Sequence, residues 1–344
     1  MSLWAAVMSI IITICGSNEF THLQWAMYSP SLFLLSAIAL LQLTACDVQT
    51  ERQTAKTSLP PVILEKMGYL GASKLDEASG LQASFSYSGD FFVHNDEGES
   101  LLYVIDGNGD DLGEIFIYPA KNKDWEDLTS VPVDDDRWLV AGDIGDNQSK
   151  RKYITLYFIK EPRPDKDGRY SGRRELEHRL DLTYPDGARD CESMAYDPIG
   201  KRILLLSKRD KPARLYAVDL ETALNENQTE LKFLGTISVL RPPTMADRRK
   251  WGTKADWISQ PTGLDISADG NEAVIITYRS LYRYRRHAGE NWLNALQRKP
   301  QEVVGPPAPQ NEAVAYSTDG KTIFVVSEKR PAPIFRFQFT DDNG

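Results

Sequence analysis

The sequence predicts an all-β fold, a β-propeller of five four-stranded blades, with six blades including a degenerate one as the alternative. Two observations lead to this prediction. After residue 61 the chain consists of short β-type segments separated by turns rich in Gly, Asp, Asn and Pro, with no long helical period. In addition, one acidic or amide position recurs five times along the chain. With 344 residues, of which 41% are hydrophobic, the chain can form one large all-β domain.

The recurring position opens five similar segments, which we expect to be the innermost strands of the blades. They are residues 77–81 (EASGL), 126–130 (EDLTS), 192–196 (ESMAY), 260–264 (QPTGL) and 312–316 (EAVAY). The third residue after the recurring position is always small: Gly80, Thr129, Ala195, Gly263 or Ala315. Small side chains fit this place because the innermost strands crowd around the propeller axis.

Further strands follow each of these segments. The expected second strands are residues 91–94, 138–141, 203–206, 273–277 and 323–326, and the third strands are 101–105, 154–158, 214–218, 281–284 and 334–337. Fourth strands lie near 113–117, within 175–182, and at 231–234 and 301–304, with insertions at 161–174 and 239–259. The fifth unit ends after three strands, so residues 62–69 are expected to complete it and close the ring.

Five of these segments also support a family resemblance. The sequences EASGL, DWEDL, CESMAY, PTGL and NEAVAY resemble the inner strands of the SdiA-regulated family of bacterial propeller proteins, over roughly residues 62–338. A broader likeness to exported propellers of the phytase-like and esterase-like kinds involves HNDEG (94–98) and GDIGDN (142–147). The resemblance implies a propeller fold and no particular reaction, because one fold hosts many functions.

The N-terminus predicts export and lipid anchoring. Residues 32–43 form an apolar run shorter than the ~20 residues that span a bilayer, as in a signal peptide. The run ends in Leu43-Thr44-Ala45-Cys46, which resembles the lipobox of bacterial lipoproteins. We therefore expect a signal peptide at 1–45, a tether at 46–61 lipidated on Cys46, and the propeller at 62–344. Because 26 residues with a second apolar patch (10–15) lie ahead of Met27, translation is expected to start at Met27; an uncleaved anchor without a lipid is the alternative.

These features place the protein in the bacterial cell envelope, facing the periplasm and held to a membrane by Cys46. By analogy with enteric lipoproteins, Asp47 suggests the inner membrane. The net charge of −9 and the absence of a basic patch argue against a nucleic-acid partner, and we expect a monomer. Cys191 is the remaining cysteine of the mature chain, and we expect it to be a buried small hydrophobe.

The recurring position predicts a cation site. In a propeller, the loops that enter the innermost strands lie at one mouth of the central channel. Carboxylates and an amide crowded there repel one another unless a cation or a proton relieves them. Oxygen ligands favour a hard cation, with Ca²⁺ before Mg²⁺. The candidate ligands are Glu77, Glu126, Glu192, Gln260 and Glu312. The alternative is a structural ring in which these side chains accept backbone N–H groups of adjacent blades.

The ends of the second strands should meet at the same mouth and bind a ligand. The candidate residues are Asn95, Asp96, Asp143, Asp146, Asn147, Lys208, Arg209, Tyr278, Arg279, Glu328 and Lys329. The first two blades present Asn95, Asp96, Asp143 and Asp146, and the other three present the bases Lys208, Arg209, Arg279, Lys329 and Arg330. This division suits a metal beside an anionic group, or else charge compensation within the rim. Residues 106–111 (DGNGDD) resemble a calcium loop but lack its Gly at position six and its final Glu, so we expect a hairpin turn.

The sequence contains no nucleophile elbow, P-loop or dinucleotide fingerprint, and it identifies no catalytic residues. The primary hypothesis is therefore a membrane-anchored propeller that binds a small molecule or protein at its mouth, with a Ca²⁺ ion as the candidate cofactor. The alternative is a metal-assisted hydrolase of a phosphoester or another anionic substrate. A glycosidase is weaker, because symmetric glutamates lack the asymmetry of an acid and a base.

Overall fold

The computed structural model describes residues 62–308 and 310–339. The expected signal peptide, the tether and Cys46 lie outside the described residues. Within the described part, no helix is long and apolar enough to cross a membrane.

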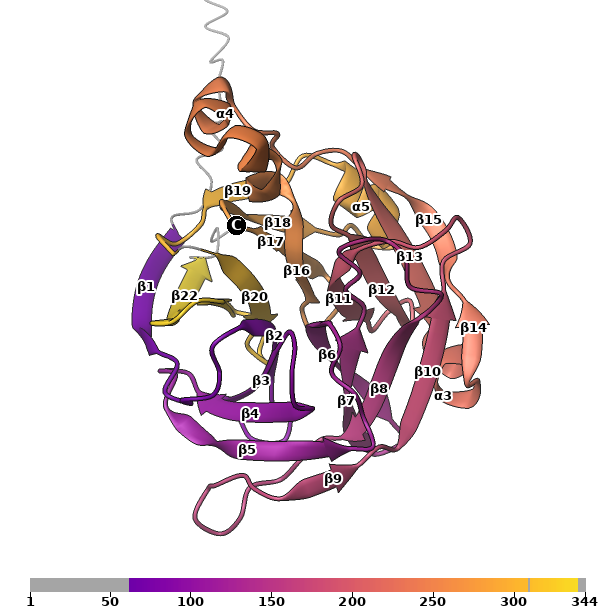
Figure 1. The fold of residues 1–344 in the computed structure, drawn as a ribbon, viewed down its shortest axis with the longest axis vertical. Coiled ribbons are helices and arrows are strands. Elements are labelled where there is room, and N and C mark those ends of the chain that lie inside the picture. The colour runs from indigo at the N-terminus through magenta and orange to yellow at the C-terminus, as the bar shows by residue number, and fades with distance from the viewer. Residues whose placement is uncertain (1–61, 309, 340–344) are drawn as a thin grey trace, which may run out of the picture. The chain divides into compact units, whose positions relative to one another are not determined.

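The described chain is a five-bladed β-propeller, which confirms the predicted fold (Figure 1). Blade one contains β2 (Ala78–Ala83), β3 (Asp90–Asn95), β4 (Leu101–Asp106) and β5 (Asp111–Tyr118). Blade two contains β6 (Trp125–Val133), β7 (Asp136–Asp143), β8 (Ile154–Lys160) and β10 (His178–Thr183). Blade three contains β11 (Cys191–Asp197), β12 (Arg202–Ser207), β13 (Ala213–Asp219) and β15 (Lys232–Ile237). Blade four contains β16 (Pro261–Ile266), β17 (Glu272–Thr277), β18 (Ser280–Arg285) and β19 (Gln301–Val304).

Blade five is closed by the start of the described chain, as predicted. It contains β20 (Asn311–Tyr316), β21 (Thr322–Ser327) and β22 (Pro333–Phe339). The strand β1 (Val62–Tyr69) pairs antiparallel with β22, from Val62 opposite Phe339 to Tyr69 opposite Pro333. These residues fall in one compact unit, Ser58–Gly344, and the core clusters described by the structure all lie between its blades. The propeller therefore has its own core and needs no earlier residue to close its ring.

The middle strands of the blades are buried on both faces, which explains their unbroken apolar runs. In β12 only Arg202 is partly exposed, and in β17 only Glu272 is. Because blades stack face to face, both faces of a middle strand meet a neighbouring blade. Each Å² of apolar surface that is removed from water stabilises the fold by roughly 25 cal/mol, so these strands contribute most of the stability.

The inserted segments add short elements that the sequence analysis did not assign. The strand β9 (Arg173–Glu175) extends blade one, and β14 (Gln228–Glu230) extends blade two, both in parallel pairing. The helices are α3 (Leu220–Asn225), α4 (Met245–Trp251), the 3₁₀ helix η1 (Gly252–Ser259) and α5 (Trp292–Gln297). Residues 106–111 form the predicted hairpin turn, in which the Asp106 carboxylate accepts the N–H groups of Asn108 and Asp110. Cys191 is a buried free thiol, as expected.

Side chains from neighbouring blades satisfy the inner edges of the innermost strands. An edge strand leaves backbone N–H groups unpaired, and a buried unpaired N–H group is costly. The buried Asp127 carboxylate accepts the N–H groups of Leu128 at 2.9 Å, Met194 at 2.7 Å and Leu264 at 3.3 Å. It thereby links the innermost strands of blades two, three and four. Burial raises the pKa of Asp127 well above its usual range, although the three N–H groups oppose this.

The surroundings of Gly80 show how closely the innermost strands pack at the axis. A Cβ atom there would lie 2.8 Å from the Leu128 backbone nitrogen and 2.9 Å from the Asp127 carbonyl carbon, and closer still to His94 Nε2. Gly80→Ala is therefore expected to lower the free energy of unfolding by about 1–3 kcal/mol. Urea unfolding would measure the loss. Gly168→Ala is the comparison, because Gly168 lies in an exposed loop with no atom near its Cβ position but with φ of +76°, so it reports backbone strain without crowding. Unchanged stability of Gly80→Ala would contradict the crowding.

Candidate functional site

The start of every innermost strand carries two rings of residues around the channel. Strand pairing places Ala78, Trp125, Cys191, Pro261 and Asn311 at equivalent positions, each followed by a β-bulge. The residue after each forms the inner ring: Ser79, Glu126, Glu192, Thr262 and Glu312. The residue before each forms the outer ring: Glu77, Asp124, Asp190, Gln260 and Gln310. The recurring position predicted from the sequence is therefore two residues too early in blades one and four. Glu77 and Gln260 belong to the outer ring, and Ser79 and Thr262 take the inner-ring positions.

This arrangement adds three polar residues that the sequence analysis missed: Asp124, Asp190 and Gln310. The pattern that could have found them is an acid or amide two residues before the inner-ring position, as in DWE, DCE and QNE. In the other two blades the inner ring carries a hydroxyl instead, which bonds to the next blade. Ser79 Oγ donates to the Glu126 carbonyl at 2.9 Å, and Thr262 Oγ1 donates to the Asn311 carbonyl at 2.8 Å.

Seven of the ten ring residues and several residues at the exits of the second strands line a cavity of about 200 Å³ at the mouth, whereas Asp190, Gln260 and Thr262 lie outside its lining. Its lining includes the proposed site residues Glu77, Asp96, Glu126, Asn147, Glu192, Lys208, Arg209, Tyr278, Glu312 and Glu328. It also includes Ser79, Glu97, Asp124, Trp257 and Gln310. The remaining candidates Asn95, Asp143, Asp146, Gln260, Arg279 and Lys329 are not among its lining residues.

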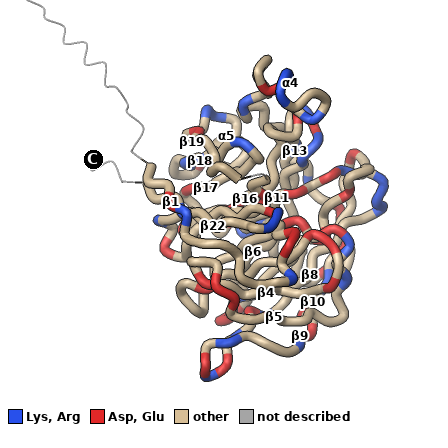
Figure 2. The backbone as a smooth tube through the Cα atoms, turned by 60° about the vertical axis from the view of Figure 1, so that its left-hand side comes forward, with Lys and Arg blue, Asp and Glu red and all other residues tan. Residues whose placement is uncertain are grey.

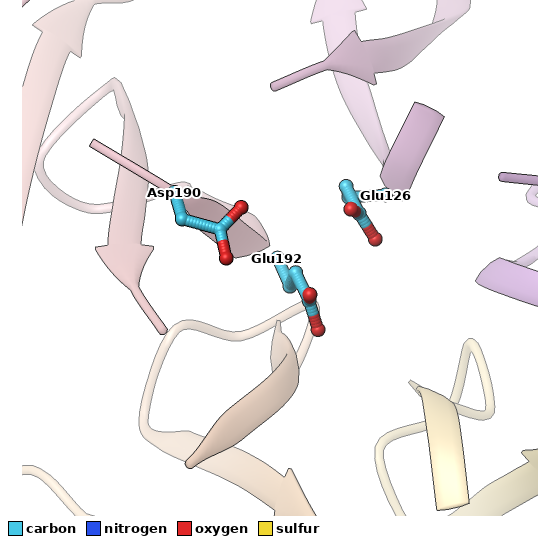
Figure 3. Close-up of side chains that lie close together, drawn as sticks. All are labelled: Glu126, Asp190 and Glu192. Carbon is cyan, nitrogen blue, oxygen red and sulfur yellow. The ribbon is translucent and has the colours of Figure 1, made fainter. Parts of the chain in front are cut away.

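Three carboxylates at this mouth form a potential metal site. Glu126, Asp190 and Glu192 are buried, and each offers an oxygen within 4.8 Å of the others (Figure 3). Glu126 comes from blade two, whereas Asp190 and Glu192 come from blade three. Oxygens that share a Ca²⁺ ion at 2.3–2.6 Å lie within about 5 Å of one another. The cluster therefore has the spacing and the oxygen chemistry to hold a hard cation.

Burial disfavours the charges of these carboxylates. Burial raises the pKa of Glu192 to about 7, although the Lys208 ammonium opposes the shift. Burial raises the pKa of Glu126 well above its usual range, and the charges of Glu192 and Asp124 add to this. For Asp124, burial and the nearby charge of Asp190 raise the pKa to about 6. The mouth thus holds carboxylates that gain from a proton or a cation near neutral pH.

Lys208 and Arg209 neutralise part of this charge. Lys208 Nζ forms an ion pair with Glu192 Oε2 and lies 3.5 Å from the Tyr278 hydroxyl. Burial alone would lower the pKa of Lys208, but the charges of Glu192 and Glu312 raise it well above its usual range. Arg209 Nε lies 2.5 Å from Asp190 Oδ2, and the N–H direction misses that oxygen, so this contact is an ion pair without a hydrogen bond.

The charge balance of the inner mouth stays negative. Two basic groups, Lys208 and Arg209, face five carboxylates, which leaves three negative charges if all are ionised. The carboxylates are those of Asp124, Glu126, Asp190, Glu192 and Glu312. Burial, with Glu77 as a second cause, also raises the pKa of Asp96 at the rim to about 7. The mouth is therefore suited to a cation.

The other predicted rim residues hold the surrounding loops. Asp143 pairs with Arg151 at 2.7 Å, and Asp146 accepts the Arg151 backbone N–H at 2.7 Å. The Asn95 amide bonds to the Glu77 N–H and the Lys74 carbonyl.

The remaining two bases of the rim also have partners. Arg279 pairs with Asp247 at 3.0 Å and donates to Ser259 Oγ at 3.0 Å. Lys329 lies 3.8 Å from Glu328. Much of the rim charge is therefore compensated within the rim itself.

Comparison with known proteins gives no family. No family model and no curated protein matches the sequence. Similar solved structures include a luciferin-regenerating enzyme, with a TM-score of 0.41 and 9% identity over 81% of this chain and 95% of that chain. Raptor from Chaetomium thermophilum has a TM-score of 0.41 and 10% identity, over 85% of this chain but 30% of its own. Such distant likenesses carry no functional argument, so function must be argued from the residues of this chain.

Proposed function

We propose that this protein is a membrane-anchored, exported ligand-binding propeller whose mouth holds a Ca²⁺ ion. The observation that carries the proposal is the buried cluster of Glu126, Asp190 and Glu192. The anchor in the proposal is the lipidated Cys46, and the cell-envelope location follows from it. Membership of the SdiA-regulated family remains part of the same proposal.

Ca²⁺ is the preferred occupant because the donors are all oxygens and come from separate chain segments. Zn²⁺ prefers His and Cys ligands, and within residues 62–308 and 310–339 no such side chain belongs to the cluster. Mg²⁺ requires a strict octahedral geometry and gives up its waters reluctantly, whereas Ca²⁺ accepts six to eight ligands in flexible geometry. A divalent ion would relieve most of the surplus charge of the mouth.

We favour binding over hydrolysis because the bases expected to hold a substrate anion already have partners. Lys208 pairs with Glu192, Arg209 with Asp190 and Arg279 with Asp247. Breaking a buried pair to bind a phosphoester leaves an uncompensated charge, which costs about 3–5 kcal/mol.

Calorimetric titration with CaCl₂ tests the proposal on the chain from Asp47 to Gly344, since the propeller has its own core. We expect one ion per chain, with tighter binding at about pH 8 than at about pH 6. The pKa values of about 7 for Glu192 and about 6 for Asp124 explain the direction, because protonated carboxylates must release protons to bind the ion. MgCl₂ should bind more weakly.

A pH-independent affinity would contradict the assignment to these carboxylates, and the absence of binding at about pH 8 would refute the cation site itself. Glu99→Gln offers a matched control, because Glu99 is exposed and lies outside the mouth cavity. This variant should bind Ca²⁺ as tightly as the wild type.

A further inference from the structure

A second cavity lies beside the mouth and differs from it in chemistry. It has a volume of about 720 Å³, and it shares Trp257, Tyr278 and Gln310 with the mouth cavity. Its other walls include the side chains of Lys250, Trp251, Lys254, Arg279 and Lys329. The mouth is rich in carboxylates, whereas this cavity is aromatic and basic, so the two are suited to different chemical groups.

One wall of this cavity is the α4–η1 insertion, and the structure holds it in place. Thr244 and Asp247 form a reciprocal capping box at the start of α4. Arg279, from the β17–β18 turn, pairs with Asp247 at 3.0 Å and donates to Ser259 Oγ at 3.0 Å, so it ties both ends of the insertion to blade four. The cavity wall is therefore preorganised, which lowers the cost of binding.

The insertion presents two tryptophans and two lysines at the surface. Trp251 is 43% exposed and Trp257 is 41% exposed. Lys250 Nζ lies 5.1 Å from the centroid of the Trp251 ring, and Lys254 Nζ lies 5.0 Å from that of Trp257. Within the residues that the structure describes, neither lysine has an ion-pair partner, although the whole chain carries a net charge of −9. Figure 2 shows basic positions gathered along α4.

We propose that this cavity binds a planar aromatic molecule that carries an anionic group. Exposed indole rings cost free energy in water and offer flat faces on which an aromatic ligand can stack. The lysine ammonium groups beside each ring then neutralise a carboxylate, sulfonate or phosphate of the same molecule. Arg279 is occupied by Asp247 and acts here as a positioning residue.

This site goes beyond the proposed function and does not need the cation. The cavities share the wall residues Trp257 and Tyr278, so they lie side by side. We therefore expect an ion in the mouth to attract an anionic group that is bound in the aromatic cavity. That arrangement predicts tighter binding of the aromatic anion when Ca²⁺ is present.

Fluorescence titration with anilinonaphthalene sulfonate tests the inference on the chain from Asp47 to Gly344. The probe carries a flat naphthalene ring and a sulfonate group, and phenylnaphthylamine is its uncharged counterpart. In the presence of a chelator we expect one saturable site for the sulfonate, and binding at least about fivefold weaker for the uncharged probe. Lys254→Gln and Trp257→Leu should each weaken sulfonate binding by about fivefold or more.

Lys166→Gln is the matched control, because Lys166 is an exposed lysine in the loop before β9, on another part of the propeller. It should leave the affinity unchanged, and melting temperatures should show that all variants are folded. Equal binding of the two probes would overturn the inference, as would unchanged affinity in both cavity variants. Binding of the insertion to anionic lipid vesicles without any sulfonate site would also overturn it. Because the titration contains chelator, its failure is distinguishable from the failure of the Ca²⁺ site.

Discussion

Asp127→Ala is expected to lower the free energy of unfolding by about 3–5 kcal/mol, the largest stability effect that the structure predicts. The substitution leaves the N–H groups of Leu128, Met194 and Leu264 without an acceptor at the buried axis. Each unsatisfied buried donor costs about 1–3 kcal/mol, and losses at neighbouring sites are not additive. Equilibrium unfolding in urea measures the change.

Two variants test how the loss depends on the number of hydrogen bonds. Asp127→Asn removes the charge, which burial already disfavours, and keeps one of the two oxygens that accept these bonds, so it should cost less than Asp127→Ala, which removes both. Asp265→Ala should also cost less, since Asp265 accepts two backbone N–H groups, those of Ile266 and Tyr316. Wild-type stability of Asp127→Ala would show that the axis does not depend on this side chain.

Glu126→Gln is expected to change stability and cation binding in opposite directions. Burial and the charges of Glu192 and Asp124 raise the pKa of Glu126 well above its usual range. In the folded state its carboxyl group therefore holds a proton at pH values where the unfolded chain has lost it, and this contribution to stability falls as pH rises above the ordinary value. The amide of the variant is neutral at every pH and does not lose this stability. In chelator at about pH 8 the variant should therefore melt at a higher temperature than the wild type.

The same substitution removes a cation ligand. Ca²⁺ affinity should fall at least about tenfold, since even the loss of an outer hydrogen-bond partner of a metal ligand costs about 10- to 100-fold. Glu161→Gln is the contrasting control. One oxygen of this buried glutamate accepts both the Ser84 hydroxyl at 2.7 Å and the Ser86 N–H at 2.9 Å, and the amide keeps such an oxygen, so the substitution should not raise the melting temperature and should leave Ca²⁺ binding unchanged. A Glu126→Gln variant that binds Ca²⁺ as the wild type does would remove Glu126 from the site.

The blades could be predicted because their signals are local and repeated. The apolar runs of β12 and β17 follow from burial on both faces, and the turns between strands carry Gly, Asp and Asn. The closure of the ring by β1 could be predicted because every blade needs four strands and the fifth unit had only three. The register of the inner-strand starts could not be predicted, since a β-bulge adds a residue to a strand without a characteristic sequence. This is why Glu77 and Gln260 were placed in the wrong ring.

The partners of the rim residues were also beyond the sequence. Arg279 was expected to be available to a ligand, but Asp247 and Ser259 reach it from an insertion that ends 20 residues earlier in the chain. The helix α4 did carry a local signal, because Thr244 and Asp247 are spaced as in a capping box. Which charges remain unpaired depends on such long-range contacts, and they decide whether the mouth is suited to a cation or an anion.

Anomalous X-ray scattering from crystals grown with CaCl₂ at about pH 8 tests the central claim most directly, because it locates the ion as well as detecting it. The account predicts one peak at the mouth, within about 2.3–2.6 Å of carboxylate oxygens of Glu126, Asp190 and Glu192. A mouth without a peak, or a peak only at the Asp106 turn, would contradict it.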